Sequence, residues 1–161
     1  MTTLPTEIER KFLVNHAAWA AAGQPEGQLL SQGYLSQDPE RTVRIRLQGD
    51  EAWITVKGQV QGLTRAEFEY AIPPGDAAQM LETLTLSALS KRRTRVFVGA
   101  HVWDVDVFLG SLTGLILAEV ELSSEDEPFV RPEWLGQEVS HDPRYFNSAL
   151  ARSGVIPDKA T

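Results

Sequence analysis

The chain has 161 residues, a formal net charge of −7 at pH 7 and no cysteine. The lack of cysteine excludes disulfides, zinc–thiolate sites and thiol nucleophiles, and the acidic balance argues against general nucleic-acid binding, which needs many basic residues. No apolar run is long enough for a membrane span, and the N-terminal residues lack the apolar core of a signal peptide. We therefore expect a cytoplasmic protein whose partners are neither nucleic acids nor membranes.

Apolar and polar residues alternate along most of the chain with the two-residue period of β-strands. Short connections rich in turn residues, such as "GD" at 49–50 and "GSLTG" at 110–114, separate these segments and predict antiparallel hairpins. The predicted strands span residues 7–14, 28–35, 41–48, 51–58, 63–72, 88–98, 101–109 and 115–122.

Helical patterns are few. The spacing predicts helices over 15–23, where Asn15 is the expected N-cap, over 73–84 and over 142–154, and we expect a further helical turn within 132–139. The composition and pattern predict a single α+β domain, in which eight antiparallel strands form a closed barrel with a few flanking helices. We expect this domain to span residues 1–161, with its core at 6–152 and a loose tail at 155–161.

One face of almost every predicted strand is charged. Like charges recur in pairs two residues apart, as in Glu7 and Glu9 or Arg44 and Arg46, at a spacing of about 7 Å. A solvated face is the simpler explanation for any single strand, because antiparallel sheets often have one polar face. The repetition of mutually repelling pairs favours a site that binds both metal ions and a polyanion.

If the sheet closes, these charges line a hydrated tunnel, since so many charges cannot form a dry core. The apolar strand faces then point outward, where helices or a second copy of the chain cover them, so a homodimer is one expectation. The charged face comprises the carboxylates Glu7, Glu9, Glu67, Glu69, Asp104, Asp106, Glu119 and Glu121 and the cations Lys11, Arg44, Arg46, Lys57, Arg65, Lys91, Arg93 and Arg95.

The segment "EIERK" at 7–11 resembles the E-x-E-x-K signature of the CYTH superfamily, also called triphosphate tunnel metalloenzymes. Further segments resemble the blocks of that family in its order: "QGYLS" at 32–36, "VRIR" at 43–46, "TVKG" at 55–58, "RAEFEY" at 65–70, "SKRR" at 90–93, "WDVDVFLG" at 103–110, "LAEVEL" at 117–122 and "DPRYFN" at 142–147. The resemblance covers about residues 6–152 and is strongest to the short bacterial inorganic triphosphatases.

This resemblance implies a tunnel that binds a linear triphosphate together with Mg²⁺ or Mn²⁺. The residues implied to grip phosphate are Lys11, Arg44, Arg46, Lys57, Lys91 and Arg93. The residues implied to hold metal are Glu7, Glu9, Asp104, Asp106, Glu119 and Glu121, with Glu67 and Glu69 as supporting carboxylates. Arg95 follows Lys91 and Arg93 on the same strand face, so the pair of cations that contacts substrate stays open.

Two routes for activating water are compatible with these residue types. In the first, metal ions neutralise the phosphates and orient water, and Glu67, Glu69 or another carboxylate on the metal side accepts the proton. In the second, which the short family members suggest, Lys11 acts as a base that Tyr34 holds in place. Tyr34 is equally well explained as a packed strand aromatic. The block that contains Tyr145 and Asn147 resembles a helix that covers one end of the tunnel.

The leading interpretation is hydrolysis of inorganic tripolyphosphate to orthophosphate and pyrophosphate. The alternatives are hydrolysis of an organic triphosphate, such as thiamine triphosphate or a nucleotide, adenylate cyclase activity on ATP in the same tunnel, and a non-catalytic module that binds polyphosphate.

Overall fold

The computed structural model describes residues 4–157, and within them the chain forms nine β-strands and three α-helices. Residues 158–161 of the expected tail lie outside the described residues. The elements in chain order are β1 (Thr6–Val14), α1 (His16–Ala21), β2 (Gln28–Asp38), β3 (Arg41–Gln48), β4 (Glu51–Gly58), β5 (Thr64–Ala71), α2 (Pro74–Thr83), β6 (Ser87–Val98), β7 (His101–Phe108), the 3-10 turn η1 (Gly110–Leu112), β8 (Ile116–Glu121), β9 (Leu135–Glu138), the 3-10 turn η2 (Pro143–Tyr145) and α3 (Asn147–Ser153).

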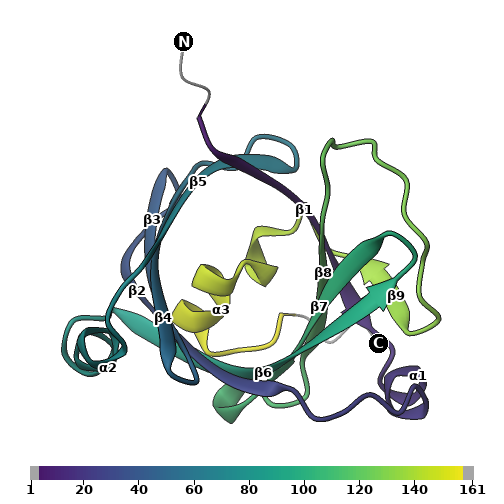
Figure 1. Ribbon diagram of the computed structural model, residues 1–161, viewed down its shortest axis with the longest axis horizontal. Coiled ribbons are helices and arrows are strands. Elements are labelled where there is room, and N and C mark those ends of the chain that lie inside the picture. The colour runs from purple at the N-terminus through teal and green to yellow at the C-terminus, as the bar shows by residue number, and fades with distance from the viewer. Residues whose placement is uncertain (1–3, 158–161) are drawn as a thin grey trace.

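Eight of these strands close into a ring. They are hydrogen-bonded in the order β5-β4-β3-β2-β6-β7-β8-β1, and every pairing is antiparallel. Strand β1 closes the ring, because Thr6–Ile8 pair with β5 while the following residues up to Leu13 pair with β8. The ring is visible end-on in Figure 1. The α+β class and the closed antiparallel barrel that the sequence predicted are confirmed.

The expected helical turn within 132–139 is wrong, because Leu135–Glu138 form strand β9. This strand pairs with the end of β1 on the outside of the ring, with Leu135 opposite Val14 and Glu138 opposite Phe12. An ion pair at 2.6 Å between Arg10 Nη2 and Glu138 Oε1 fixes the same contact. Partners more than a hundred residues away therefore decide the conformation of this segment, and its local pattern does not.

The predicted helix over 142–154 is interrupted. Asp142 caps the turn η2 and Gly154 ends α3 with a φ of 64°, as the sequence indicated, but Phe146 between them is extended. Tyr145 is the last residue of η2, and Lys11 Nζ donates a hydrogen bond to its backbone oxygen at 3.0 Å. The break thus ties the C-terminal segment to the barrel wall.

The outward strand faces are apolar and are covered by the remaining elements. Phe12 and Trp103 are fully buried on the outside of β1 and β7, where Trp134 and the partly buried Trp19 of α1 pack. On the opposite side of the ring, Ala77 of α2 packs against Ile45 of β3. Helices and loops of the same chain thus cover much of the apolar surface that the sequence predicted to point outward.

The inward faces are charged only along part of the barrel. On β1, β6 and β8, the residue two positions from a charged inward residue is a leucine on the same strand face. These leucines are Leu13 beside Lys11, Leu89 beside Lys91, and Leu117 beside Glu119. These leucines pack with the fully buried Leu150 of α3 in one cluster. Helix α3 is seen within the ring in Figure 1, so this end of the barrel has an apolar plug.

We expect Leu150→Ala to lower the free energy of unfolding by about 2–5 kcal/mol, because it removes a fully buried side chain from the plug. Chemical denaturation of the two proteins measures this difference. The matched control is Leu86→Ala, at a leucine that is 68% exposed, which should cost less than about 0.5 kcal/mol. Equal losses in both variants would show that the plug does not contribute to the core.

None of the helices in the described part of the chain is long and apolar enough to cross a membrane.

Candidate active site

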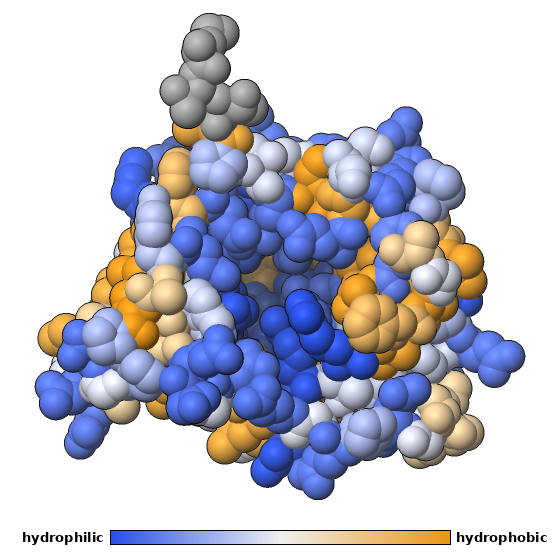
Figure 2. All heavy atoms as spheres, in the orientation of Figure 1, coloured by the Kyte–Doolittle hydropathy of each residue, from blue (hydrophilic) through white to orange (hydrophobic). Residues whose placement is uncertain are grey.

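A cavity of about 220 Å³ lies inside the ring, on the charged side of the plug. In Figure 2 it is the central hollow, and its walls are hydrophilic. All residues that the sequence proposed for the site line this cavity except Lys11 and Asp106, and Arg65 and Arg95 line it as well. Lys11 and Asp106 are buried in the wall. The structure therefore gathers nearly the whole predicted set around one space.

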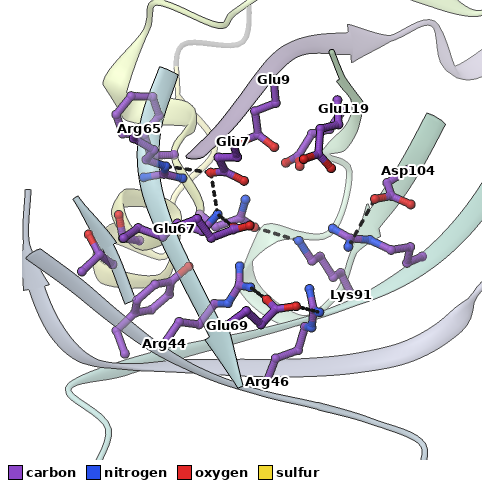
Figure 3. Close-up of a pocket in the computed structure, with 18 of the residues that line it drawn as sticks. Glu7, Glu9, Arg44, Arg46, Arg65, Glu67, Glu69, Lys91, Asp104 and Glu119 are labelled. Carbon is purple, nitrogen blue, oxygen red and sulfur yellow. Dashed lines mark hydrogen bonds and ion pairs between the residues drawn. The ribbon is translucent and has the colours of Figure 1, made fainter. Parts of the chain in front are cut away.

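Positive and negative side chains are partly separated in the cavity, with Glu67 and Glu69 lying among the cations. Figure 3 shows Arg44, Arg46 and Lys91 along one side, and Glu9 and Glu119 along the other. The separation follows from strand order, because β3 and β6 flank β2 on one side of the ring while β1 and β8 are neighbours on the other. A polyanion on the cationic side would thus face a row of carboxylates.

Two arginines of β3 line the cavity with incompletely hydrogen-bonded guanidinium groups. Arg44 Nη2 donates to Thr55 Oγ1 at 3.1 Å, while the Nε atoms of Arg44 and Arg46 are buried without a hydrogen-bond partner. Burial, and the nearby guanidinium groups of Arg44 and Arg93, lower the pKa of Arg46 to about 10. Such concentrated positive charge is favourable only next to an anion, so this wall suits a phosphate group. Trp53 packs under Arg46, with the guanidinium carbon 4.9 Å from a ring centroid.

A second cationic group is built on β6 and β7 around Asp106. This carboxylate accepts hydrogen bonds from Arg93 Nε at 2.7 Å and from Arg93 Nη2 at 2.9 Å, and Lys91 Nζ lies 2.7 Å from it. Burial raises the pKa of Asp106, but Arg93 and Lys91 outweigh that effect and lower it overall. Burial lowers the pKa of Lys91 to about 8, although Asp106 opposes this shift. Asp106 thus orients two cations from behind.

The three cations on the charged face of β6 differ in how far they are exposed. The side chain of Arg93 is 14% exposed and points into the cavity wall, whereas that of Arg95 is 72% exposed. Arg95 Nε is 3.5 Å from Asp104. Lys91 and Arg93 therefore lie inside the cavity, and Arg95 lies at its rim.

Glu7 is paired with cations on neighbouring strands. Its Oε1 accepts hydrogen bonds from Lys57 Nζ and Arg65 Nε, both at 2.8 Å. Burial raises the pKa of Glu7, but Lys57 and Arg65 together lower it well below its ordinary value. Glu67 is 3.3 Å from Lys57 Nζ, and burial together with the hydrogen bond to Glu7 raises its pKa to about 6.

Four other carboxylates of β1, β7 and β8 have no cation closer than 3.5 Å in the described part of the chain: Glu9, Asp104, Glu119 and Glu121. In register, Glu9 lies opposite Glu121, and Asp104 lies opposite Glu119. Burial and repulsion by Glu119 and Glu7 raise the pKa of Glu9 to about 8. Asp104 Oδ1 and Glu119 Oε1 are buried without a hydrogen-bond partner. Mutually repelling carboxylates with unsatisfied oxygens are the donors that a hard divalent cation prefers.

The residues present therefore fit a divalent metal ion. Within residues 4–157, no three carboxylates or imidazoles converge closely enough to enclose an ion by themselves. This is compatible with Mg²⁺, which retains several waters and is usually held by one or two carboxylates together with phosphate oxygens.

We expect the effect of added Mg²⁺ on the melting temperature to increase with pH. Because the folded-state pKa of Glu9 is raised from 4.5 to about 8, the folded protein binds more protons than the unfolded chain in this interval. Without metal, stability is therefore fully present at about pH 4.5 and decreases as the pH rises to about 8. The lowered carboxylates Glu7 and Glu119 titrate below this interval.

Thermal unfolding with and without Mg²⁺ at about pH 5 and about pH 8 measures this difference. Glu9→Gln is the control, because it removes the carboxyl group with the pKa of about 8, and it should reduce the pH dependence to the part that Glu67, with a pKa of about 6, contributes. Equal shifts at both pH values in the wild type would contradict the prediction.

Lys11 and Tyr34 each have other partners. Lys11 Nζ donates to the backbone oxygen of Tyr145 and is 3.5 Å from Glu119, whereas the hydroxyl of Tyr34 accepts a hydrogen bond from Gln32. No hydrogen bond joins Lys11 to Tyr34 in the part of the chain that the structure describes. The pairing that the family resemblance suggested thus has no hydrogen bond among the described residues.

Neutral residues complete the site, and the sequence analysis passed over most of them. Thr55 donates to Glu69 Oε2 at 2.8 Å, and Asn147 Oδ1 accepts from Lys91 Nζ at 2.9 Å. Ser148 also lines the cavity. Thr55 precedes Lys57 by two residues and so lies on the same strand face. The two-residue period could have identified Thr55, but the candidate set comprises only the charged residues of that strand face.

Comparisons with known proteins agree with this geometry. Residues 5–148 match the CYTH domain family. The inorganic triphosphatase of Acetivibrio thermocellus is 41% identical over 148 residues, which cover 91% of this chain and 94% of that protein. The inorganic triphosphatase of Nitrosomonas europaea is 38% identical over 156 residues, covering 92% and 98%. A crystal structure of an inorganic triphosphatase superposes with a TM-score of 0.59 at 36% identity, covering 90% of this chain and 97% of that one.

Proposed function

The chain belongs to the CYTH domain family, and on that premise we propose that it hydrolyses inorganic tripolyphosphate to orthophosphate and pyrophosphate with a divalent metal ion. The observation that carries this proposal is the separation of charge inside the barrel. Cations on one side match a linear polyanion, and carboxylates on the other side would suit a divalent metal ion. Relatives called inorganic triphosphatases, at about 40% identity over nearly the whole chain, support the same substrate.

The cations neutralise and orient the phosphates. Phosphoryl transfer requires mainly positioning and charge stabilisation, which Arg forks and Lys ammonium groups supply. Arg44 and Arg46 contribute guanidinium groups that line the cavity, and Asp106 holds Lys91 and Arg93 in place. The residues assigned to phosphate binding are Lys11, Arg44, Arg46, Lys57, Lys91 and Arg93.

The family implies a divalent metal ion, and we assign Mg²⁺ or Mn²⁺. Glu9, Asp104, Glu119 and Glu121 would hold it. Among the described residues Glu9 and Glu121 form no ion pair, and the cations nearest to Asp104 and Glu119 lie 3.5 Å away. Glu7 and Asp106, which the family resemblance also implied, act chiefly as counter-ions for Lys57, Arg65, Lys91 and Arg93. When bound, the metal neutralises phosphate charge and lowers the pKa of a coordinated water.

Glu67 is the better placed of the two proposed proton acceptors. Glu69 accepts a hydrogen bond from Thr55 and lies 3.5 Å from Arg44 and 3.7 Å from Arg46, so its oxygens are occupied by the cationic wall. Glu67 has Lys57 as its cationic partner, and it lines the cavity. We therefore assign the proton from the attacking water to Glu67, while Glu69 orients the two arginines.

We assign Lys11 to phosphate binding as a charged donor and not to catalysis as a base, because its ammonium group donates to Tyr145 and faces Glu119. We expect Lys11→Arg to retain kcat within about tenfold, since it keeps the positive charge and the donors. Lys11→Met should lower kcat/KM by roughly 10²-fold, because both are lost. If Lys11→Arg is as inactive as Lys11→Met while both proteins stay folded, Lys11 is the base.

A substrate panel tests the function. Phosphate release from tripolyphosphate, pyrophosphate, ATP and thiamine triphosphate is measured with Mg²⁺ and with Mn²⁺, and ATP reactions are analysed for cyclic AMP. We expect tripolyphosphate to have the highest kcat/KM. A higher value for an organic triphosphate, or formation of cyclic AMP, would replace the proposal by one of those activities. Binding of tripolyphosphate without turnover would indicate a binding module. The homodimer and the cytoplasmic location stay predictions from the sequence.

A further inference from the structure

Gln32 is a buried polar residue beside the central cavity that the mechanism above does not use. It lies on β2 two residues before Tyr34, and the two residues are 1% and 3% exposed. Tyr34 lines the central cavity, while Gln32 lines a separate cavity of about 420 Å³ next to Leu81 of α2 and Leu150 of α3. Gln32 thus lies directly behind a residue of the site.

The hydrogen bond between them has a defined direction. Gln32 Nε2 donates to the hydroxyl oxygen of Tyr34 at 3.0 Å. An amide nitrogen cannot accept, so the hydrogen of the hydroxyl must point to another partner. Among residues 4–157, no protein group accepts it. Because Tyr34 lines the cavity, that hydrogen is available to a ligand inside it.

The surroundings of Tyr34 favour an anionic acceptor. Tyr34 lies opposite Arg44 across the β2–β3 pair, and both residues line the central cavity. Burial raises the pKa of Tyr34, so its hydroxyl keeps the proton and remains a donor. A phosphoryl oxygen in this position would receive hydrogen bonds from both side chains.

Stability alone does not explain a glutamine at this position. Gln32 Oε1 is buried and has no hydrogen-bond partner, which costs free energy that an apolar side chain of similar volume would avoid. We propose that Gln32 is a positioning residue, which fixes the Tyr34 hydroxyl as a hydrogen-bond donor to a phosphoryl oxygen of the bound triphosphate. This inference rests on the proposed function, and it gives Tyr34 a role that does not involve Lys11.

A double-mutant cycle tests the inference. The affinity for tripolyphosphate is measured by calorimetry without added divalent metal for the wild type, Gln32→Met, Tyr34→Phe and the double variant. Methionine keeps the volume of glutamine but has no donor. We expect each single variant to weaken binding by roughly fivefold to tenfold, and the double variant to be no weaker than Tyr34→Phe, because Gln32 acts only through Tyr34.

Gln37→Met is the matched control, because Gln37 lies on the same strand but bonds Ser87 and the backbone of Ser148 instead of Tyr34. It should bind tripolyphosphate like the wild type. Should Gln32→Met fail to fold, Gln32→Asn replaces it, since the shorter side chain keeps the amide but withdraws it from the hydroxyl. Additive losses in the cycle, or wild-type affinity of a folded Gln32 variant, would overturn the inference.

The pH–rate profile separates this role from a pairing of Tyr34 with Lys11. We expect Tyr34→Phe to lower kcat/KM without changing the shape of the profile. A shift of its basic limb would show that Tyr34 acts on Lys11 and would overturn the inference. Because the cycle measures binding, it remains informative if the wild type binds tripolyphosphate without hydrolysing it, an outcome that rejects only the proposed function.

Discussion

Replacing Lys91 by methionine should lower kcat/KM for tripolyphosphate by roughly 10²–10³-fold. The Nζ of Lys91 is fixed between Asp106 at 2.7 Å and Asn147 at 2.9 Å, so it is held ready at the cavity wall before substrate binds. Methionine preserves the apolar stem of the side chain but removes the charge and all three donors. Arg93 still pairs with Asp106 in the variant, so that buried carboxylate keeps a cationic partner.

Steady-state kinetics with Mg²⁺ measure this loss. The matched control is Arg41→Met on β3, which removes a cation whose side chain is 66% exposed and which pairs with Asp38 outside the cavity. It should leave kcat/KM within about twofold, because surface ion pairs contribute little. Wild-type kcat/KM in a folded Lys91→Met protein would show that Lys91 does not contact the reacting phosphates.

Glu119→Gln is expected to weaken the apparent affinity for Mg²⁺ by more than about 100-fold, with a corresponding loss of activity at limiting metal. Burial raises the pKa of Glu119, but Lys11 and Lys91 lower it far more, so the group is ionised at neutral pH and can bind metal. Its Oε1 is buried without a hydrogen-bond partner. The amide keeps the shape of the side chain and removes the charge on which metal binding depends.

Titration of activity with Mg²⁺ gives the apparent affinity, and saturating metal should restore part of the activity. Glu82→Gln on α2 makes the same substitution at an exposed residue outside the cavity, and it should leave the metal dependence unchanged. If Glu119→Gln shows the same Mg²⁺ dependence as the wild type, Glu119 is not a metal ligand.

The barrel could be predicted from the sequence because its signal is local. Each of the eight strands of the ring carries its own alternation, and the connections carry turn residues, so these strands and the antiparallel hairpins between consecutive ones follow without long-range knowledge. The pairings of β2 with β6 and of β1 with β5 and β8 were not predicted. The separation of faces also follows, since residues such as Glu7, Glu9 and Lys11 share one face by the period of two. The charged residues that line the cavity were therefore predicted to lie on the same face of the sheet.

The parts that could not be predicted depend on contacts between distant residues. Leu135–Glu138 form a strand because the end of β1 offers an edge, and Phe146 is extended where Lys11 binds the neighbouring carbonyl. Contacts between distant residues also decide which carboxylates pair with cations and which remain able to bind a metal ion. Glu7 and Glu9 look alike in sequence, but cations of β4 and β5 surround Glu7, whereas Glu9 faces other carboxylates.

The central claim is that the charged interior hydrolyses tripolyphosphate with a divalent metal ion. Phosphorus-31 NMR of tripolyphosphate incubated with the protein tests this claim most directly, in parallel reactions with Mg²⁺ and with a chelator. We expect orthophosphate and pyrophosphate to appear in equal amounts with Mg²⁺, and tripolyphosphate to persist with the chelator. Tripolyphosphate that stays intact in both reactions, or is consumed equally fast in both, would contradict the account.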